Sequence, residues 1–274
     1  MQRPTAATAY LGYVFGALGA ESVPGPCLID LLLDLGMSES AVRTMLSRQN
    51  RAGQLSSSHH GRVAVYRLEG SYRERFLRIR QGDEPVSWPG GFQLIMYDIA
   101  ESRRRDRDAL RERAAAVGFG APRPGVLIGF SDPAEWARPW LERDDLFVRA
   151  GELRCTLETA CELAERTWRL RDAAPRIGAF VKRLQQLRQR DVHHPASQLK
   201  AFRMFADVMR DYAGLSASTP TLPIEITPQD WLGRELSTAL REVSTLLGPR
   251  VSAHASETAE RRNLTHLVQP LTEG

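Results

Sequence analysis

A short segment near the amino end carries the side chains best suited to chemistry in this 274-residue chain. Arg43, Ser47 and Arg51 recur at four-residue steps, and Thr44 and Arg48 lie beside them. On a helix this spacing puts three guanidinium groups and two hydroxyl groups on one stripe. Arginine binds phosphates or reads guanine bidentately, while Ser and Thr contact either backbone or base. The stripe therefore suits DNA, although such a pattern is also found on an ordinary solvated helix face.

The positive charge of the chain is concentrated around this stripe. Residues 38–80 contain nine arginines against three glutamates, a net charge of +6, whereas the whole chain has a formal net charge of +4. A basic segment on an otherwise nearly neutral protein indicates a polyanionic partner for that segment. The charge excess favours DNA binding over the solvated-face interpretation.

Composition limits the class of protein. With 42% hydrophobic and 26% charged residues, the chain is typical of a globular protein, and its length suggests two or three compact units. No apolar stretch approaches the ~18 residues of a membrane span and the first residues lack a signal pattern, so we expect a cytoplasmic protein without a membrane partner. Three cysteines without a C-x-x-C pair argue against a disulfide framework and a cysteine-based zinc site.

The elements that must position the stripe follow from turn and cap signals. Residues 5–18 and 27–35 are apolar and predict two helices. Gly36 suits the left-handed residue that follows a helix, and Ser38 suits the N-cap of the next one. A helix over residues 38–51 then carries the stripe.

After this helix the pattern predicts a β-hairpin. Residues 62–68 alternate as a strand does, residues 54–58 precede them, and the polar tip of His59, His60 and Gly61 contains a turn glycine. Helix, turn, helix and hairpin is the order of a winged helix-turn-helix, whose second helix enters the major groove of DNA. The DNA contacts predicted from this arrangement are Ser40, Arg43, Thr44, Ser47, Arg48, Arg51, His60 and Arg62.

The middle of the chain alternates between strand and helix signals. Residues 81–90 are rich in Gly and Pro and predict a linker that follows a DNA-binding domain over residues 1–80. Strands over 92–99 and 125–130 frame a helix, which predicts a small ferredoxin-like α+β module over 91–156. Its other expected elements are a helix at 136–141 and strands at 146–149 and 152–156.

The rest of the chain has mainly helical spacing. Residues 157–250 predict a helical effector and dimerisation domain, whose last helix should end at Pro249. Residues 251–274 are polar and predict a loosely ordered tail. The predicted fold class is therefore α+β and multidomain, with a winged helix-turn-helix, a ferredoxin-like module and a mainly helical domain in that order.

Three sequence blocks resemble the PaaX family of repressors of phenylacetic acid catabolism. Residues 38–55 (SESAVRTMLSRQNRAGQL) resemble its recognition-helix signature. Residues 92–128 (FQLIMYDIAESRRRDRDALRERAAAVGFGAPRPGVLI) are similar to its central module, and residues 222–243 (LPIEITPQDWLGRELSTALREV) to its C-terminal segment. The blocks occur in the family's order, and the resemblance spans about residues 6–248, which is most of the chain.

The resemblance implies a homodimeric repressor of a catabolic operon. It implies pseudo-palindromic double-stranded operator DNA as partner and a CoA thioester such as phenylacetyl-CoA as the releasing effector. Such an effector needs an apolar pocket and cations for its phosphates. Candidates in the helical part are Trp168, Phe202 and Trp231 for the pocket, and Arg166, Arg203 and Arg234 for the phosphates. Helical spacing equally allows these aromatic residues to be ordinary core.

Two other classes of function stay open at this point. The family's central module is similar to a small nuclease with a metal-binding Asp at the end of its first strand, so a metal-dependent nuclease would act through Asp98. One carboxylate is not a metal site, and Asp98 with Glu101 three residues later favours a helix cap. The second alternative is a winged unit that binds protein. The His59-His60 and His193-His194 pairs lack partner ligands, so we expect no metal, no cofactor and no catalytic residue.

Overall fold

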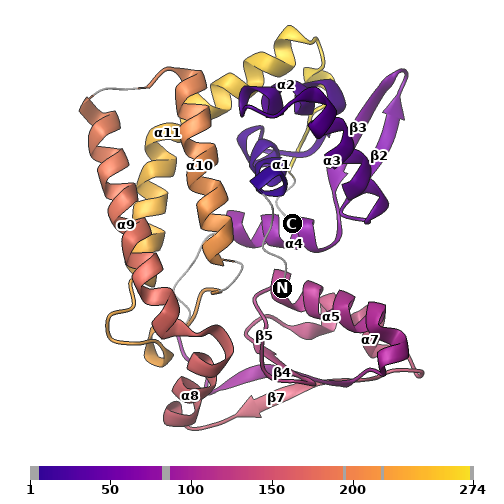
Figure 1. Ribbon diagram of the computed structural model, residues 1–274, viewed down its shortest axis with the longest axis vertical. Helices are drawn as coiled ribbons and strands as arrows, with labels where there is room; N and C mark the ends of the chain where they lie inside the picture. Colours follow the sequence, from indigo (N-terminus) through magenta and orange to yellow (C-terminus); the bar gives the residue numbers. More distant parts are fainter. Residues whose placement is uncertain (1–5, 82–86, 194–195, 217–218, 272–274) are drawn as a thin grey trace. The chain divides into compact units, whose positions relative to one another are not determined.

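The computed structural model describes residues 6–81, 87–193, 196–216 and 219–271 (Figure 1). It is an α+β structure with two four-stranded sheets, in each of which neighbouring strands are antiparallel. The predicted α+β class is therefore confirmed. Of the expected linker over 81–90, residues 82–86 lie outside the described part of the chain.

The chain forms two compact units, each assembled from separated segments. The first contains residues 81–180 and 215–236. The second contains residues 2–80, 181–214 and 237–274. Residues 157–250, expected as one helical domain, are thus divided between both units, because long helices run from one unit into the other.

The amino-terminal part of the second unit combines four helices with a sheet. The sheet has the strand order β2-β3-β1-β8. The first strand and the helix after the hairpin had no clear sequence signal. The elements are α1 (Ala6–Ala17), β1 (Ala20–Pro24), α2 (Gly25–Asp34), α3 (Glu39–Arg51), β2 (Leu55–His60), β3 (Val63–Leu68) and α4 (Gly70–Gln81).

Local signals explain how α2 and α3 are joined. Gly36 has φ +84°, a left-handed conformation that favours glycine, directly after α2. Ser38 is the N-cap of α3, and its hydroxyl accepts a hydrogen bond from the amide of Ala41 at 3.3 Å. Both predictions are confirmed. The hairpin prediction needs one correction, because His59 and His60 are the last residues of β2 and pair with β3, so the turn begins at Gly61.

The carboxyl-terminal part of the second unit is more ordered than its polar composition suggested. The expected helix end at Pro249 is wrong, because α11 continues through that proline and ends at Arg261. Residues 251–261 are therefore helical, and β8 pairs with β1 where a loose tail was expected. The long helices and last short elements are α9 (Leu170–His193), α10 (Gln198–Ser216), α11 (Gly233–Arg261), a 3₁₀ turn at Thr265–Leu267, and β8 (Gln269–Pro270).

The first unit is built on the sheet β5-β6-β4-β7. The two short strands expected at 146–149 and 152–156 are one strand, β7, which pairs with all eight residues of β4. The strand β5 had not been expected. The elements are β4 (Gly91–Asp98), a 3₁₀ turn at Glu101–Arg103, α5 (Arg104–Ala116), β5 (Gly120–Arg123), β6 (Val126–Gly129), α6 (Pro133–Trp136), α7 (Arg138–Leu141), β7 (Phe147–Arg154), α8 (Leu157–Trp168) and a 3₁₀ turn at Ile224–Ile226.

Asp98 does not cap the helix that follows β4, which corrects the cap prediction. It is the last residue of β4, where it pairs with Phe147, and its side chain is exposed. The N-cap position of the next turn is Ala100, which makes no side-chain cap hydrogen bond. The strand extends further than the Asp98–Glu101 spacing suggested, so the helical region begins too late for Asp98 to cap it.

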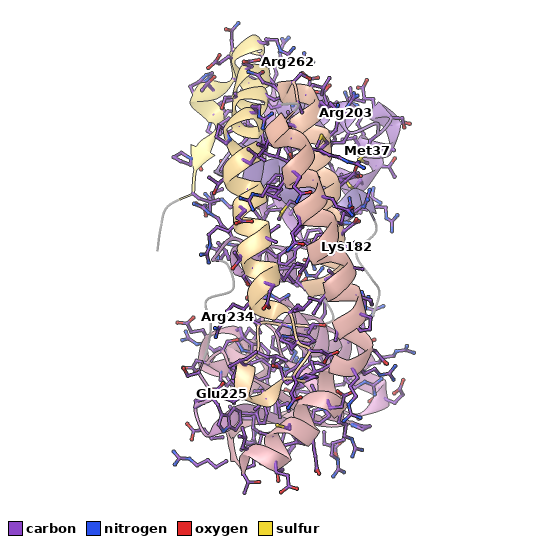
Figure 2. All side chains as sticks on the ribbon, turned by 90° about the vertical axis from the view of Figure 1, so that its left-hand side faces the viewer. Met37, Lys182, Arg203, Glu225, Arg234 and Arg262 are labelled. Atoms are coloured by element: carbon purple, nitrogen blue, oxygen red, sulfur yellow. The ribbon has the colours of Figure 1, made fainter. Side chains whose placement is uncertain are left out.

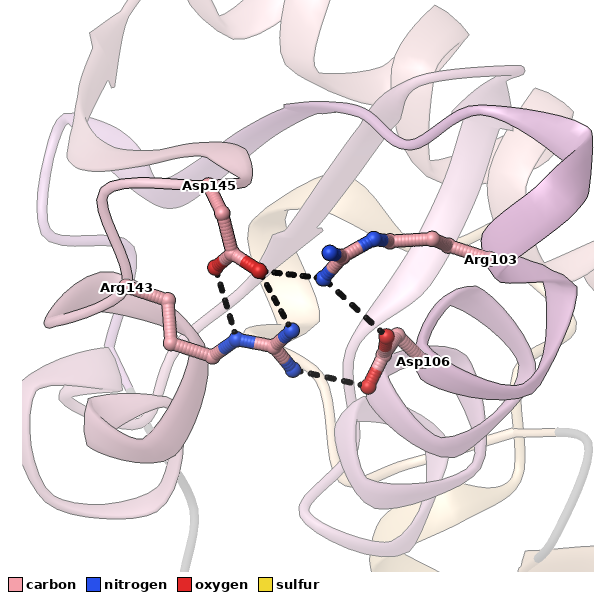
Figure 3. A network of polar contacts seen from close by, with 4 residues as sticks. All are labelled: Arg103, Asp106, Arg143 and Asp145. Carbon is pink, nitrogen blue, oxygen red and sulfur yellow. Dashed lines mark hydrogen bonds and ion pairs between the residues drawn. The ribbon is translucent and has the colours of Figure 1, made fainter.

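Arg103, the first of three consecutive arginines at 103–105, belongs to an ion-pair network on the first unit (Figure 3). Arg143 binds Asp106 at 2.8 Å and Asp145 at 3.0 Å, and Arg103 also binds Asp145. The two guanidinium groups lower the pKa of Asp145 well below its ordinary range, chiefly through hydrogen bonds from Arg143. Arg103 is thus engaged within the unit rather than left free as part of a basic patch.

Candidate nucleic-acid interface

The helix α3 has one buried face and one exposed face. Val42, Met45 and Leu46 are buried, as their helical spacing predicts. They hold the helix on the core of the unit, which includes fully buried Leu28 and Leu31 of α2. The opposite face is exposed and carries the six predicted contacts of this helix, Ser40, Arg43, Thr44, Ser47, Arg48 and Arg51.

The cations on this exposed face differ in how free they are. Arg43 is paired with Glu39 one turn earlier, with its Nη2 and Nε at 2.7 and 2.9 Å from Oε1 of the carboxylate. Within the part of the chain that the structure describes, Arg48 and Arg51 make no such pair. Two of the three charges are therefore available to a phosphate, and the third is partly neutralised.

The hairpin extends the polar surface beyond α3. His60 and Arg62 are exposed at its end, on either side of Gly61. Asn50 in the last turn of α3 donates a hydrogen bond from Nδ2 to the hydroxyl of Ser57 on β2, at 3.3 Å. This link, which has no signal in the sequence, ties the orientation of the hairpin to that of the helix.

Polar contacts fasten the helix before α3 to the carboxyl-terminal part of the chain, and two of the side chains involved, Arg203 and Arg262, are labelled in Figure 2. Arg262 binds both carboxylate oxygens of Asp30, at 2.6 and 2.7 Å. His254 contacts the carboxylate of Asp34 at 2.8 Å, and the Nε of Arg203 donates to the backbone oxygen of Asp34 at 2.6 Å. A movement of α10 or α11 would therefore act directly on α2 and, through the Gly36 turn, on α3.

The six predicted effector residues do not gather in one unit. Four of them, Arg166, Trp168, Trp231 and Arg234, belong to the first unit, and Phe202 and Arg203 belong to the second. Phe202 is fully buried against the rings of Tyr13 and His254, at centroid distances of 5.1 and 4.9 Å.

In the first unit the aromatic candidates also occupy core positions. Trp168 lies in an aromatic cluster with Phe92 and Phe130, and Trp231 is buried as well. Arg166 donates to the backbone oxygen of Pro122 at 2.9 Å. The role of the six residues as effector ligands stays a prediction.

The candidate metal ligands also remain separate. Across the described residues, no group of three or more His, Cys, Asp or Glu side chains is placed to hold a metal ion. Asp98 is exposed at the end of β4. His194 lies outside the described residues, so the 193–194 pair has no geometry to test.

The chain belongs to the PaaX family. Three family descriptions match in order along it: PaaX-like protein over residues 11–71, PaaX protein central Cas2-like domain over 85–150, and PaaX-like protein C-terminal domain over 168–257. The sequence resemblance to this family is thereby confirmed.

The chain is also similar to individual proteins. The Transcriptional repressor PaaX of Escherichia coli (strain K12) is 24% identical over 246 residues, which cover 85% of this chain and 77% of that protein. The solved structure of the Uncharacterized protein Rv0674 from Mycobacterium tuberculosis matches with a TM-score of 0.46 and 24% identity, over 91% of this chain and 98% of that one. Separately, no helix among the described residues has the length and apolar character needed to cross a membrane.

Proposed function

We propose that this protein is a transcriptional repressor that binds operator DNA through α3. The observation that carries the proposal is the exposed face of α3, on which three arginines and three hydroxyl side chains share one surface with a single acid, Glu39. Such a face can bind phosphates and read base edges together. Membership of the PaaX family, and similarity to a protein named as a repressor, support the same conclusion.

In this proposal the two sheets belong to known architectures. The segment from α1 to β3 is a winged helix-turn-helix, with α3 as recognition helix and the hairpin β2–β3 as wing. The module from β4 to β7 is ferredoxin-like, because its strand order β5-β6-β4-β7 corresponds to the 2-3-1-4 order of a β-α-β-β-α-β unit. Exposed His60 and Arg62 lie at the end of the wing, where a neighbouring phosphate or the minor groove would be in reach.

The protein acts as a homodimer in this proposal and reads a pseudo-palindrome. Two copies of α3 enter major grooves whose centres lie one or more helical turns apart, about 10–10.5 base pairs per turn. The target is a catabolic operon for an aromatic or related acid, and a CoA thioester releases the repressor. Release requires that the effector bind more tightly to a conformation with the wrong spacing of the two helices, because equal affinity for both conformations shifts nothing.

The test is a gel-shift titration on the DNA upstream of the protein's own gene. Arg48→Ala and Arg51→Ala should each weaken binding by about 1–3 kcal/mol if they contact bases. If they contact phosphates instead, each substitution should make the slope of log affinity against log salt concentration (the salt slope) shallower by about 0.9. Arg176→Ala is the matched control, because Arg176 is an exposed arginine on α9. Unchanged affinity and unchanged salt slope in both α3 variants would overturn the proposal.

A further inference from the structure

A cavity of about 400 Å³ lies entirely within the second unit. Its walls are formed by α1 and α4 on one side and by α10 and α11 on the other, with the end of β3 beside them. Apolar groups dominate the lining, for example Met209 and Val251. The volume falls in the range of small-molecule sites, about 300–1,000 Å³. None of the predicted effector residues lines this cavity.

Small residues on α1 keep the cavity open. A Cβ atom added to Gly12 would meet no atom within 4 Å, so the space beside it is unoccupied. Gly12 does not have a positive φ angle, so the backbone does not require glycine there. Glycine inside a helix is less stable than alanine. Neither backbone conformation nor tight packing therefore requires glycine at position 12. Its effect is to preserve the volume of the cavity, which a larger side chain would fill.

The charge of the lining is positive. The lining includes Arg75 and Arg80 of α4. No acidic residue is among the described residues that form the walls. The Nε of Arg75 is buried and has no hydrogen-bond partner in the described structure. A buried donor without a partner is unfavourable and needs an explanation. An oxygen atom of a bound molecule would satisfy this donor.

We propose that this cavity binds an apolar acyl group whose carbonyl or carboxylate oxygen accepts a hydrogen bond from Arg75. The inference rests on the proposed function, for which it gives the effector a binding site. At about 30 Å³ per water-sized group, the volume accommodates about a dozen non-hydrogen atoms. A complete CoA thioester is several times larger and has three phosphates. In that case only the acyl end enters, and the nucleotide lies outside beside exposed Arg80.

The position of the cavity explains how an occupant could act on DNA binding. The helices α1 and α4 precede and follow the segment that contains α3. The helices α10 and α11 carry the residues that contact Asp34 of α2, and Arg262, directly after α11, binds Asp30. An acyl group between these helices fixes their separation. It would favour the conformation of the unit in which that separation suits it best, and so change the presentation of α3.

The test measures binding to the full-length protein by isothermal titration calorimetry without DNA. The probes are phenylacetyl-CoA, octanoyl-CoA, phenylacetate, octanoate and free CoA, so that the thioester and free-acid sources are distinguished. At least one acyl probe should bind, and free CoA should bind at least tenfold more weakly. Arg75→Met should weaken binding of the acyl probe at least tenfold, while Arg73→Met, at an exposed position on the same helix, should leave it unchanged.

Two cavity-filling variants act from opposite walls. Gly12→Leu on α1 and Ser244→Leu on α11 should abolish acyl binding and, by filling empty space, should not lower the melting temperature. The control is Gly214→Leu on α10, where an added Cβ also meets nothing within 4 Å but the cavity is not involved. The inference is overturned if no acyl probe binds, or if probes bind equally well to folded Gly12→Leu and Ser244→Leu proteins.

The same variants separate this inference from the proposed function. Without any acyl probe, Gly12→Leu should still shift operator DNA, because the cavity lies away from the exposed face of α3. Acyl binding by a protein that does not bind DNA would contradict the repressor but leave the site intact. DNA binding by a protein without affinity for acyl probes would contradict the acyl-binding site but leave the repressor proposal intact.

Discussion

Replacing Glu39 by glutamine should strengthen DNA binding. A variant that failed to fold would bind DNA more weakly, so this outcome cannot result from unfolding. Glu39 is the one acid on the exposed side of α3, and its carboxylate holds Arg43 at 2.7 Å. Both side chains are more than half exposed, so the pair itself contributes little to stability. The substitution removes a charge that repels phosphates and releases the guanidinium of Arg43 to bind one.

The size of the effect follows from distance and screening. At about 7 Å from a phosphate, a unit charge in water contributes about 0.6 kcal/mol, and screening at physiological salt reduces this to about 0.25 kcal/mol. Two or three phosphates near the start of α3 make the total about 0.5–0.8 kcal/mol, or about a two- to fourfold gain in affinity. If the released Arg43 binds one more phosphate, the salt slope also steepens by about 0.9.

The assay is a fluorescence-anisotropy titration of operator DNA at 50, 100 and 200 mM salt. Glu158→Gln is the matched control, because Glu158 is an exposed acid in the first turn of α8. Both substitutions remove a favourable charge from a helix N-terminus, so they should cost similar, small amounts of stability. If Glu39→Gln binds operator no more tightly than the wild type at any of these salt concentrations, the assignment of α3 to the DNA surface is refuted.

Three further predictions concern stability and protonation. Ser38→Ala should destabilise the fold by about 1 kcal/mol in urea unfolding because α3 loses its N-cap, and an unchanged midpoint would exclude that role. Burial raises the pKa of Asp191, but hydrogen bonds from Arg250 and a backbone amide outweigh it, so the folded pKa lies below its ordinary value. The carboxylate therefore adds stability above pH 4 that is lost as the pH falls through the folded pKa. Asp191→Asn should cost about 2–4 kcal/mol at pH 7 and less at pH 3, and an equal loss at both pH values would contradict this. In Arg143→Ala the pKa of Asp145 should rise part of the way toward its ordinary value, because Arg103 still binds the carboxylate, and a pKa unchanged from the wild type in carboxyl NMR titration would show that Arg143 is not a cause of the shift.

The elements around α3 could be predicted because their signals are local. The cap at Ser38, the left-handed Gly36 and the buried stripe of Val42 and Leu46 each depend on residues within one or two helical turns. For the same reason the exposed arginines of α3 were identified correctly as exposed. Helical spacing places these arginines on the side opposite the apolar residues, and that side is exposed because the apolar side is buried.

Other elements depended on partners far along the chain. The two-residue strand β8 has no detectable pattern, and it forms because β1, about 250 residues earlier, offers an edge to pair with. The helix α11 continues through Pro249, where a local rule predicts an end, because buried Val251 and Ala255 pack on the core beyond it. Long-range burial thus outweighed the local cost of the proline.

The sequence by itself determined the family and the chemistry of the α3 surface, because charge and helical periodicity are properties of neighbouring residues. Only the tertiary structure decided which groups act together elsewhere. The pairing of Glu39 with Arg43, the contacts that hold Asp30 and Asp34, and the cavity beside Arg75 depend on how helices pack. A cavity bounded by four helices from both ends of the chain has no signal in any one segment, since its shape is set by the separation of those helices.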